Sequence, residues 1–127
     1  MRIKLTSLMV DDQDKALRFY TETLGFQKKR EIPMGQYRWL TVVSENDVEL
    51  SLEPNANVAG KAFQEAMFAQ KIPVASFEVS DIAGQYGRLK GLGVIFAGEP
   101  VQMGPVTFVN FSDSCGNWIR MYQSSAA

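Results

Sequence analysis

One pattern occurs twice in this chain and constrains its fold more than any other feature. Each copy joins the end of a strand to an aspartate suited to cap a helix, an amphipathic helix and a glycine that ends it. The first copy spans residues 10–26, with its cap at Asp12 and its stop at Gly25, and the second has Asp81 and Gly93 about 70 residues later. The repeat predicts two similar modules.

Each module is expected to contain a strand, a helix and three further strands. The alternation of apolar residues, with Gly and Pro as breakers, sets the expected bounds. The strands are predicted at residues 2–10, 26–31, 37–44 and 48–52 of the first module and at residues 73–79, 94–100, 106–112 and 118–123 of the second. A turn is expected over residues 32–36, and Leu8 and Val10 are expected to face the core.

Length and composition place both modules in one domain. A module of about 60 residues is marginal alone, so the two should share a core. We predict one α+β domain of two β-α-β-β-β modules that form a curved mixed sheet, with module one at residues 1–54 and module two at residues 73–127. Residues 55–72 form the linker, with a short helix over residues 62–71 whose packed face holds Phe63, Ala66 and Met67.

The net charge, the hydropathy and the cysteine and histidine content exclude several classes of protein. A net charge of −1 does not indicate a charged binding surface for nucleic acid or an anionic membrane. No apolar run approaches the roughly 18 residues that a membrane-spanning helix needs. The cytoplasm is the expected location. Cys115 is the single cysteine and the chain has no histidine, so neither an internal disulfide nor a thiolate metal site is expected. We predict that Cys115 is an exposed residue of the turn over residues 113–117.

Several separate motifs resemble the vicinal oxygen chelate superfamily, which includes glyoxalases, extradiol dioxygenases and bleomycin-resistance proteins. They are the paired Val-x-Asp caps, the run from Phe19 to Phe26, Arg38-Trp39-Leu40, and Asp113-x-x-Gly116-Asn117-x-Ile119. The resemblance implies that each module bends its strands into half of a cup, that a pocket lies in the cup, and that the protein forms a homodimer. It does not select an activity, because the superfamily hosts lyases, dioxygenases, epimerases and antibiotic-sequestering binders.

The enzymes of that superfamily hold a divalent metal with residues on four strands, which the motifs align with Leu5, Glu49, Val74 and Arg120. Leucine and valine have no donor atom, and a guanidinium is a permanent cation that would repel a metal ion. One carboxylate is too little for a site that needs about three protein ligands. We therefore expect no metal and no other cofactor. The alternative is a divalent metal held by residues that this alignment does not identify.

Alternation indicates which residues would line the cup instead. The lining is partly apolar and partly polar, as in small-ligand pockets. The candidate ligand-binding residues are Ser7, Glu49, Ser51, Ser76, Trp118, Arg120 and Tyr122. For Trp118 and Tyr122 the opposite interpretation stays open, because these side chains could fill the cup or a dimer interface. Arg38-Trp39 could contact a ligand or anchor a strand end, and Gly104-Pro105 could shape a mobile loop or a plain turn.

We expect a metal-independent binder of a small organic molecule. The alternative is a divergent metal-dependent lyase, isomerase or dioxygenase, or acid-base catalysis by Glu49, the candidate catalytic residue. No nucleic acid or membrane is expected as a partner. One further hypothesis is that Arg120 replaces the metal by pairing with Glu49 within 4 Å, inside a subunit or across the dimer, because arginine can bind a carboxylate through two parallel hydrogen bonds.

Overall fold

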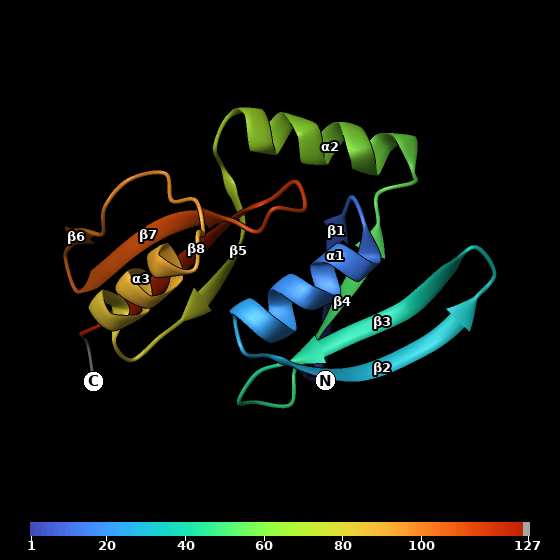
Figure 1. Cartoon of the computed structure of the whole chain (residues 1–127), viewed down its shortest axis with the longest axis horizontal. Helices are drawn as coiled ribbons and strands as arrows, with labels where there is room; N and C mark the ends of the chain where they lie inside the picture. Colours follow the sequence, from blue (N-terminus) through green and yellow to red (C-terminus); the bar gives the residue numbers. More distant parts are fainter. Residues whose placement is uncertain (126–127) are drawn as a thin grey trace.

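The computed structural model describes residues 1–125, and its elements follow the predicted order (Figure 1). The helix of module one is an α-helix continued by one π-helical turn, η1. The elements are β1 (Leu5–Val10), α1 (Gln13–Arg18), η1 (Phe19–Thr23), β2 (Gln27–Met34), β3 (Tyr37–Val43), β4 (Glu49–Pro54), α2 (Val58–Ala69), β5 (Pro73–Glu78), α3 (Ile82–Gly91), β6 (Val101–Met103), β7 (Val106–Ser112) and β8 (Trp118–Ser124).

The two modules have the same topology, as the repeat predicted. Their four-stranded mixed sheets have the orders β1-β4-β3-β2 and β5-β8-β7-β6. The first strand of each runs parallel to the last, and the other pairs are antiparallel. The caps are also equivalent, because the Asp12 carboxylate accepts from the Lys15 amide and the Asp81 carboxylate accepts from the Gly84 amide.

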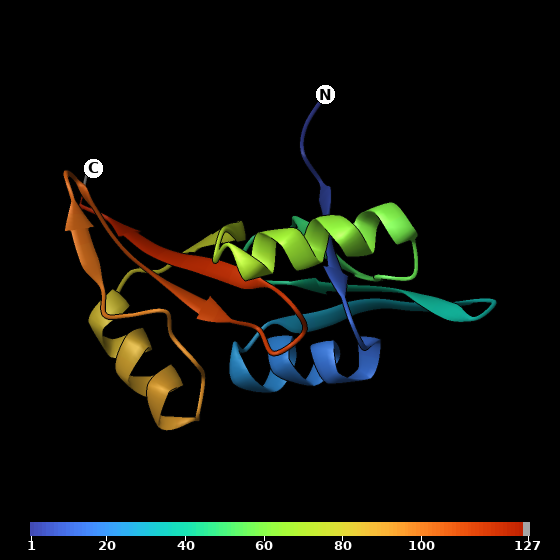
Figure 2. The same cartoon turned by 90° about the horizontal axis from the view of Figure 1, so that it is seen from above.

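The helices lie on opposite faces of the sheets. Figure 2 shows α1 and α3 on one side and α2 on the other. The face toward α1 and α3 carries the alternating apolar residues, which explains why Leu8 and Val10 are buried as predicted. The core continues through both modules and includes Leu52, Phe111 and Ile119. The opposite faces are called the concave faces below; they carry the residues that the sequence assigned to the cup.

Two edge strands differ from the prediction. The prediction of a turn over residues 32–36 is wrong for residues 32–34, because β2 continues through Pro33 to Met34. An edge strand tolerates proline because one row of its backbone groups has no strand partner. In module two the expected strand over residues 94–100 is reduced to a bridge between Phe96 and Phe111, and regular pairing begins only at β6. Pro100 has no amide to donate, so the pairing is interrupted before it.

Helix α2 begins four residues before the predicted helix and buries a different face. Phe63 is 49% exposed, whereas Gln64 is 5% exposed. The Gln64 amide nitrogen lies 2.9 Å from the Met9 carbonyl oxygen and 3.2 Å from that of Cys115. The packed face of α2 is therefore set by hydrogen bonds to carbonyl groups of both modules, which apolar periodicity does not reveal.

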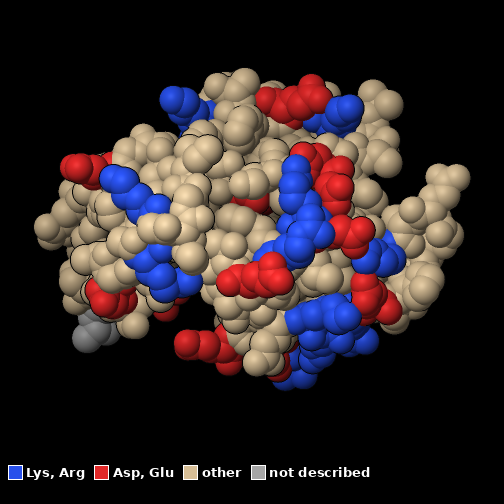
Figure 3. Space-filling model, viewed as in Figure 1, with Lys and Arg blue, Asp and Glu red and all other residues tan. Residues whose placement is uncertain are grey.

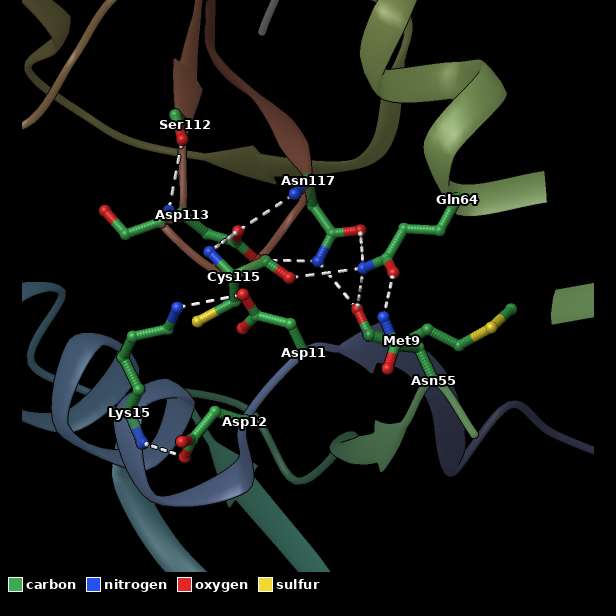
Figure 4. A network of polar contacts seen from close by, with 11 residues as sticks. Met9, Asp11, Asp12, Lys15, Asn55, Gln64, Ser112, Asp113, Cys115 and Asn117 are labelled. Carbon is green, nitrogen blue, oxygen red and sulfur yellow. Dashed lines mark hydrogen bonds and ion pairs between the residues drawn. The ribbon is translucent and has the colours of Figure 1, made fainter. Parts of the chain in front are cut away.

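The turn between β7 and β8 joins the modules (Figure 4). The buried Asp113 carboxylate accepts hydrogen bonds from the Cys115 and Asn117 amides, and the Asn117 side chain donates to the Met9 carbonyl at 2.7 Å. The Asp11 amide donates to the Cys115 carbonyl at 3.1 Å. Cys115 is consequently fully buried. The prediction of an exposed turn residue is wrong, because this turn inserts between β1 and α2.

The distribution of charge on one face, and the apolar character of the helices, can be compared with the composition. The face in Figure 3 shows acidic and basic side chains intermixed, with no extended patch of one sign. Within residues 1–125, no helix has the length and apolar character needed to cross a membrane.

Candidate functional site

Glu49 is held on the concave face of module one by a residue that the sequence analysis did not identify. Its carboxylate accepts from Arg30 through Nε at 2.7 Å and Nη2 at 3.3 Å, and from the Thr41 hydroxyl at 2.8 Å. These bonds, first that from Arg30, hold the pKa of Glu49 below its usual value. The Arg30 guanidinium also lies 5.0 Å from the centre of the Trp39 ring. Glu49 is thus an ionised, neutralised carboxylate.

The β2–β3 hairpin explains why Arg30 reaches Glu49. Arg30 pairs with Thr41 across the hairpin, and Thr41 pairs with Ser51 in β4, so residues of the three strands share one face. The register of β2 shifts between Lys28 and Arg30. A bulge changes which side chains of a strand point to a given face, so alternation counted along β2 alone does not find this contact.

Arg120 lies on the concave face of module two in different surroundings. Its Nε donates to the Asn110 side-chain oxygen at 3.1 Å, and its guanidinium carbon lies 4.1 Å from the centre of the Phe108 ring. Among residues 1–125 it has no acidic partner within 4 Å, so the predicted ion pair with Glu49 does not form inside the chain. The hypothesis is wrong there because the two residues belong to different sheets and Arg30 already neutralises Glu49. A pair across two subunits stays a prediction.

The residues at the four aligned positions do not fit a divalent metal. Leu5 lies opposite Glu49, whereas the residue opposite Arg120 is Ser76 and not Val74. Val74 is displaced because the register of β5 shifts between Pro73 and Ala75. In either register the set supplies one carboxylate, and its oxygens already bind Arg30 and Thr41. The described part of the chain contains no cluster of three His, Cys, Asp or Glu side chains that could hold a metal.

The other predicted ligand-binding residues fall into two groups. Ser7 and Ser76 are exposed on their concave faces, and Tyr122 is half-buried beside Arg120 on β8. Ser51 is buried and donates to a Glu53 carboxylate oxygen at 3.0 Å.

Trp118 is a predicted lining residue that helix α2 covers. Its Nε1 donates to the Phe68 carbonyl at 3.1 Å, and its ring stacks on the Phe68 ring at 5.4 Å. Helix α2 therefore covers this end of the concave face, and Trp118 fills space there.

The concave faces stay open in a single chain. Apolar side chains that are at least 40% exposed lie along them, including Leu5, Met34 and Met103. The β2–β3 hairpin extends beyond the rest of the chain in Figure 2. A cavity of about 460 Å³ lies elsewhere, between the modules, and is lined in part by Phe26 and Phe77. This cavity thus lies outside the concave faces, whose apolar side chains stay exposed in a single chain.

Two further segments have structural roles. Arg38 forms ion pairs with Asp14 and Glu31, each at 2.7 Å, and its backbone bonds to the Gln13 side chain, so it anchors the strand to α1. Gly104, with φ of 60°, forms the turn between β6 and β7.

Comparison with known proteins decides the family. The family model described as "Glyoxalase/Bleomycin resistance protein/Dioxygenase superfamily" matches residues 2–121. The chain belongs to this superfamily. The two-module fold and the paired caps are thus those of a glyoxalase/bleomycin-resistance protein, as the sequence motifs predicted.

Three similar proteins align with nearly the whole chain. The uncharacterized protein YurT of Bacillus subtilis (strain 168) is 50% identical over 126 residues, which cover 97% of this chain and 99% of YurT. The crystal structure of UcmS2 is similar with a TM-score of 0.82 and 32% identity, covering 99% and 98% of the two chains. TnmS3, an antibiotic binding protein from Streptomyces sp. CB03234, has a TM-score of 0.77 and 28% identity, covering 98% and 97%.

Proposed function

We propose that this glyoxalase/bleomycin-resistance protein binds a small organic molecule on its concave faces and holds it without a metal ion and without catalysis. The observation that carries the proposal is the Arg30–Glu49 pair. Glu49 is the single carboxylate at the four aligned positions, and an arginine of the same sheet already neutralises it. A permanent cation in this place makes the approach of a metal ion to Glu49 electrostatically unfavourable.

The comparison with TnmS3 supports the same function. TnmS3 is an antibiotic binding protein that shares 28% identity with this chain over almost its whole length. Binding needs a shaped pocket and a few placed polar groups and does not require a reacting residue. The concave faces offer such groups in Arg120, Ser7 and Tyr122.

The proposal includes a homodimer. Each chain leaves apolar residues exposed on both concave faces, and a second copy that covers them would complete the pocket and bury that surface. The cytoplasm stays the expected compartment. An enzyme with a divalent metal is the competing function, and it would need donors other than Leu5, Val74 and Arg120.

Two measurements on the purified protein test the proposal. Elemental analysis should find no stoichiometric nickel, zinc, iron or manganese. A thermal-shift screen of small organic molecules, antibiotics included, should find ligands that raise the melting temperature equally with and without EDTA. A ligand at 100 times its Kd should stabilise the fold by about 2.7 kcal/mol.

Variants at Glu49 separate binding from catalysis. Glu49→Gln should keep ligand binding, with Glu45→Gln in the exposed turn before β4 as the matched control. A stoichiometric metal on the concave faces, or binding that EDTA abolishes, would contradict the proposal. Turnover of a bound compound that is lost in Glu49→Gln would favour the enzyme.

A further inference from the structure

The charges on the concave faces do not balance in the same way in the two modules. In module one, Arg30 and Glu49 neutralise each other. In module two, Arg120 has no carboxylate within 4 Å among residues 1–125. A half-buried arginine without a counter-charge is a group that an anion can stabilise.

The surroundings of Arg120 fix its position and leave part of it unoccupied. Asn110 lies directly opposite Arg120 in the β7–β8 ladder and accepts from its Nε, and the guanidinium carbon lies over the Phe108 ring. The two Nη groups have no hydrogen-bond partner among the described residues. Because Nε is already held, the guanidinium is positioned before a ligand arrives, which reduces the entropy lost on binding.

The aromatic neighbours of this guanidinium indicate the rest of the ligand. Phe108 lies directly opposite Tyr122 in the same ladder, so the two rings and Arg120 share one face. This face therefore places two aromatic side chains next to a cation. Aromatic side chains in this arrangement suit a planar ring, and the free Nη groups suit a carboxylate.

We propose that Arg120 receives the carboxylate of a planar aromatic acid, whose ring packs along Phe108 and Tyr122. This inference rests on the proposed function, since it specifies the ligand class of the same pocket. This role of Arg120 differs from the earlier hypothesis that Arg120 pairs with Glu49 in place of a metal, because Arg30 already neutralises Glu49.

The test compares a matched pair of probes, 2-naphthoate and its neutral analogue 2-naphthamide, by isothermal titration calorimetry on the full chain. Wild type should bind the acid about 10- to 100-fold more tightly than the amide, because charge-assisted hydrogen bonds contribute about that ratio. The affinity for the acid should fall with added salt while that for the amide stays constant.

Variants assign the difference to one side chain. Arg120→Gln should remove the preference for the acid and keep the affinity for the amide. Arg120→Lys, which keeps the charge but loses the planar fork, should retain part of the preference. Arg18→Gln, on the outer surface of α1, is the matched control for loss of one positive charge and should behave as wild type.

The outcomes separate this inference from the proposed function. Equal binding of acid and amide to wild type would overturn the inference and leave the binding function standing. Weaker dimerisation of Arg120→Gln with an unchanged ratio of acid to amide affinity would also overturn it, since Arg120 would then pair with the second copy. Binding of neither probe, together with no ligand in the thermal-shift screen, would contradict the proposed function itself.

Discussion

Removing one buried hydroxyl should weaken the junction between the modules measurably. Tyr20 is fully buried, and its hydroxyl donates to an Asp113 carboxylate oxygen at 2.7 Å. Asp113 lies in the turn that bonds to Met9 and α2, so this bond links the helix of module one to module two. In Tyr20→Phe the carboxylate keeps the Asn117 side-chain donor at 2.8 Å but loses this one.

The expected cost follows from the type of bond. A buried hydrogen bond to a charged group contributes about 1.5 to 3 kcal/mol. With an unfolding entropy of about 2.1 cal/mol/K per residue, this corresponds to a loss of roughly 6 to 11 °C in melting temperature for a chain of this length. Urea unfolding followed by circular dichroism gives the free energy directly.

The pH dependence supplies a second readout. Burial raises the pKa of Asp113 above its usual value, while its hydrogen bonds with Asn117 and Tyr20 oppose that rise. Tyr20→Phe should raise this pKa further. The stability difference between wild type and variant is therefore largest above the pKa of Asp113 in the folded state and shrinks as the pH falls through it.

Tyr86→Phe is the matched control. Tyr86 lies on α3 of module two and is half-buried, and its hydroxyl only meets Lys90 Nζ at 3.4 Å. Its loss should change stability by less than about 0.5 kcal/mol. If Tyr20→Phe is equally mild, or if its cost does not depend on pH, the account of the junction is refuted.

Three further predictions concern single side chains. Arg30→Gln should raise the pKa of Glu49. The variant should be less stable than wild type above the usual pKa of glutamate, and this difference should vanish as the pH falls through the lowered pKa of Glu49 in wild type. Urea unfolding across pH would show the change. Gly116→Ala should cost about 1 to 3 kcal/mol, because φ is 97° and a Cβ there would lie 2.9 Å from the Gln64 amide nitrogen; an unchanged melting temperature would contradict this. Cys115, whose burial raises the pKa of its thiol to about 12, should react with Ellman's reagent at pH 8 only after unfolding, and rapid labelling of the native protein would show that it is accessible.

The fold could be predicted because its signals are local. An aspartate cap, an apolar stripe and a glycine stop are read within about 15 residues, and two copies of them define the modules. Strand β7 was predicted with its observed bounds, since Val106–Ser112 is rich in β-branched and aromatic residues and lies between Pro105 and a turn that contains Gly116. Edge strands β2 and β6 were predicted less well, because their ends depend on which neighbour they find and not on their own pattern.

The candidate site was harder to predict from the sequence because its contacts are not local. Arg30 and Glu49 are 19 residues apart and meet only through a hairpin with a shifted register. The burial of Cys115 depends on docking one module against the other and on Gln64 of α2. Neither contact has a signature in composition or periodicity. A permanent cation does neutralise Glu49, but it is Arg30 and not Arg120, to which the hypothesis assigned this role.

The Arg30–Glu49 pair has a consequence for how the proposed binding site would work. A metal site is complete only when the ion is bound, and its occupancy changes with pH and with chelators. The Arg30–Glu49 pair belongs to the chain, and its guanidinium keeps its charge throughout the physiological range. The charge of Glu49 on the concave face of module one is then neutralised before a ligand binds. The cation on the other face, Arg120, is held by Asn110 and Phe108 and still lacks an anion. Ligand selection should thus depend on Arg120, and the order of ligand affinities should be the same with and without a chelator.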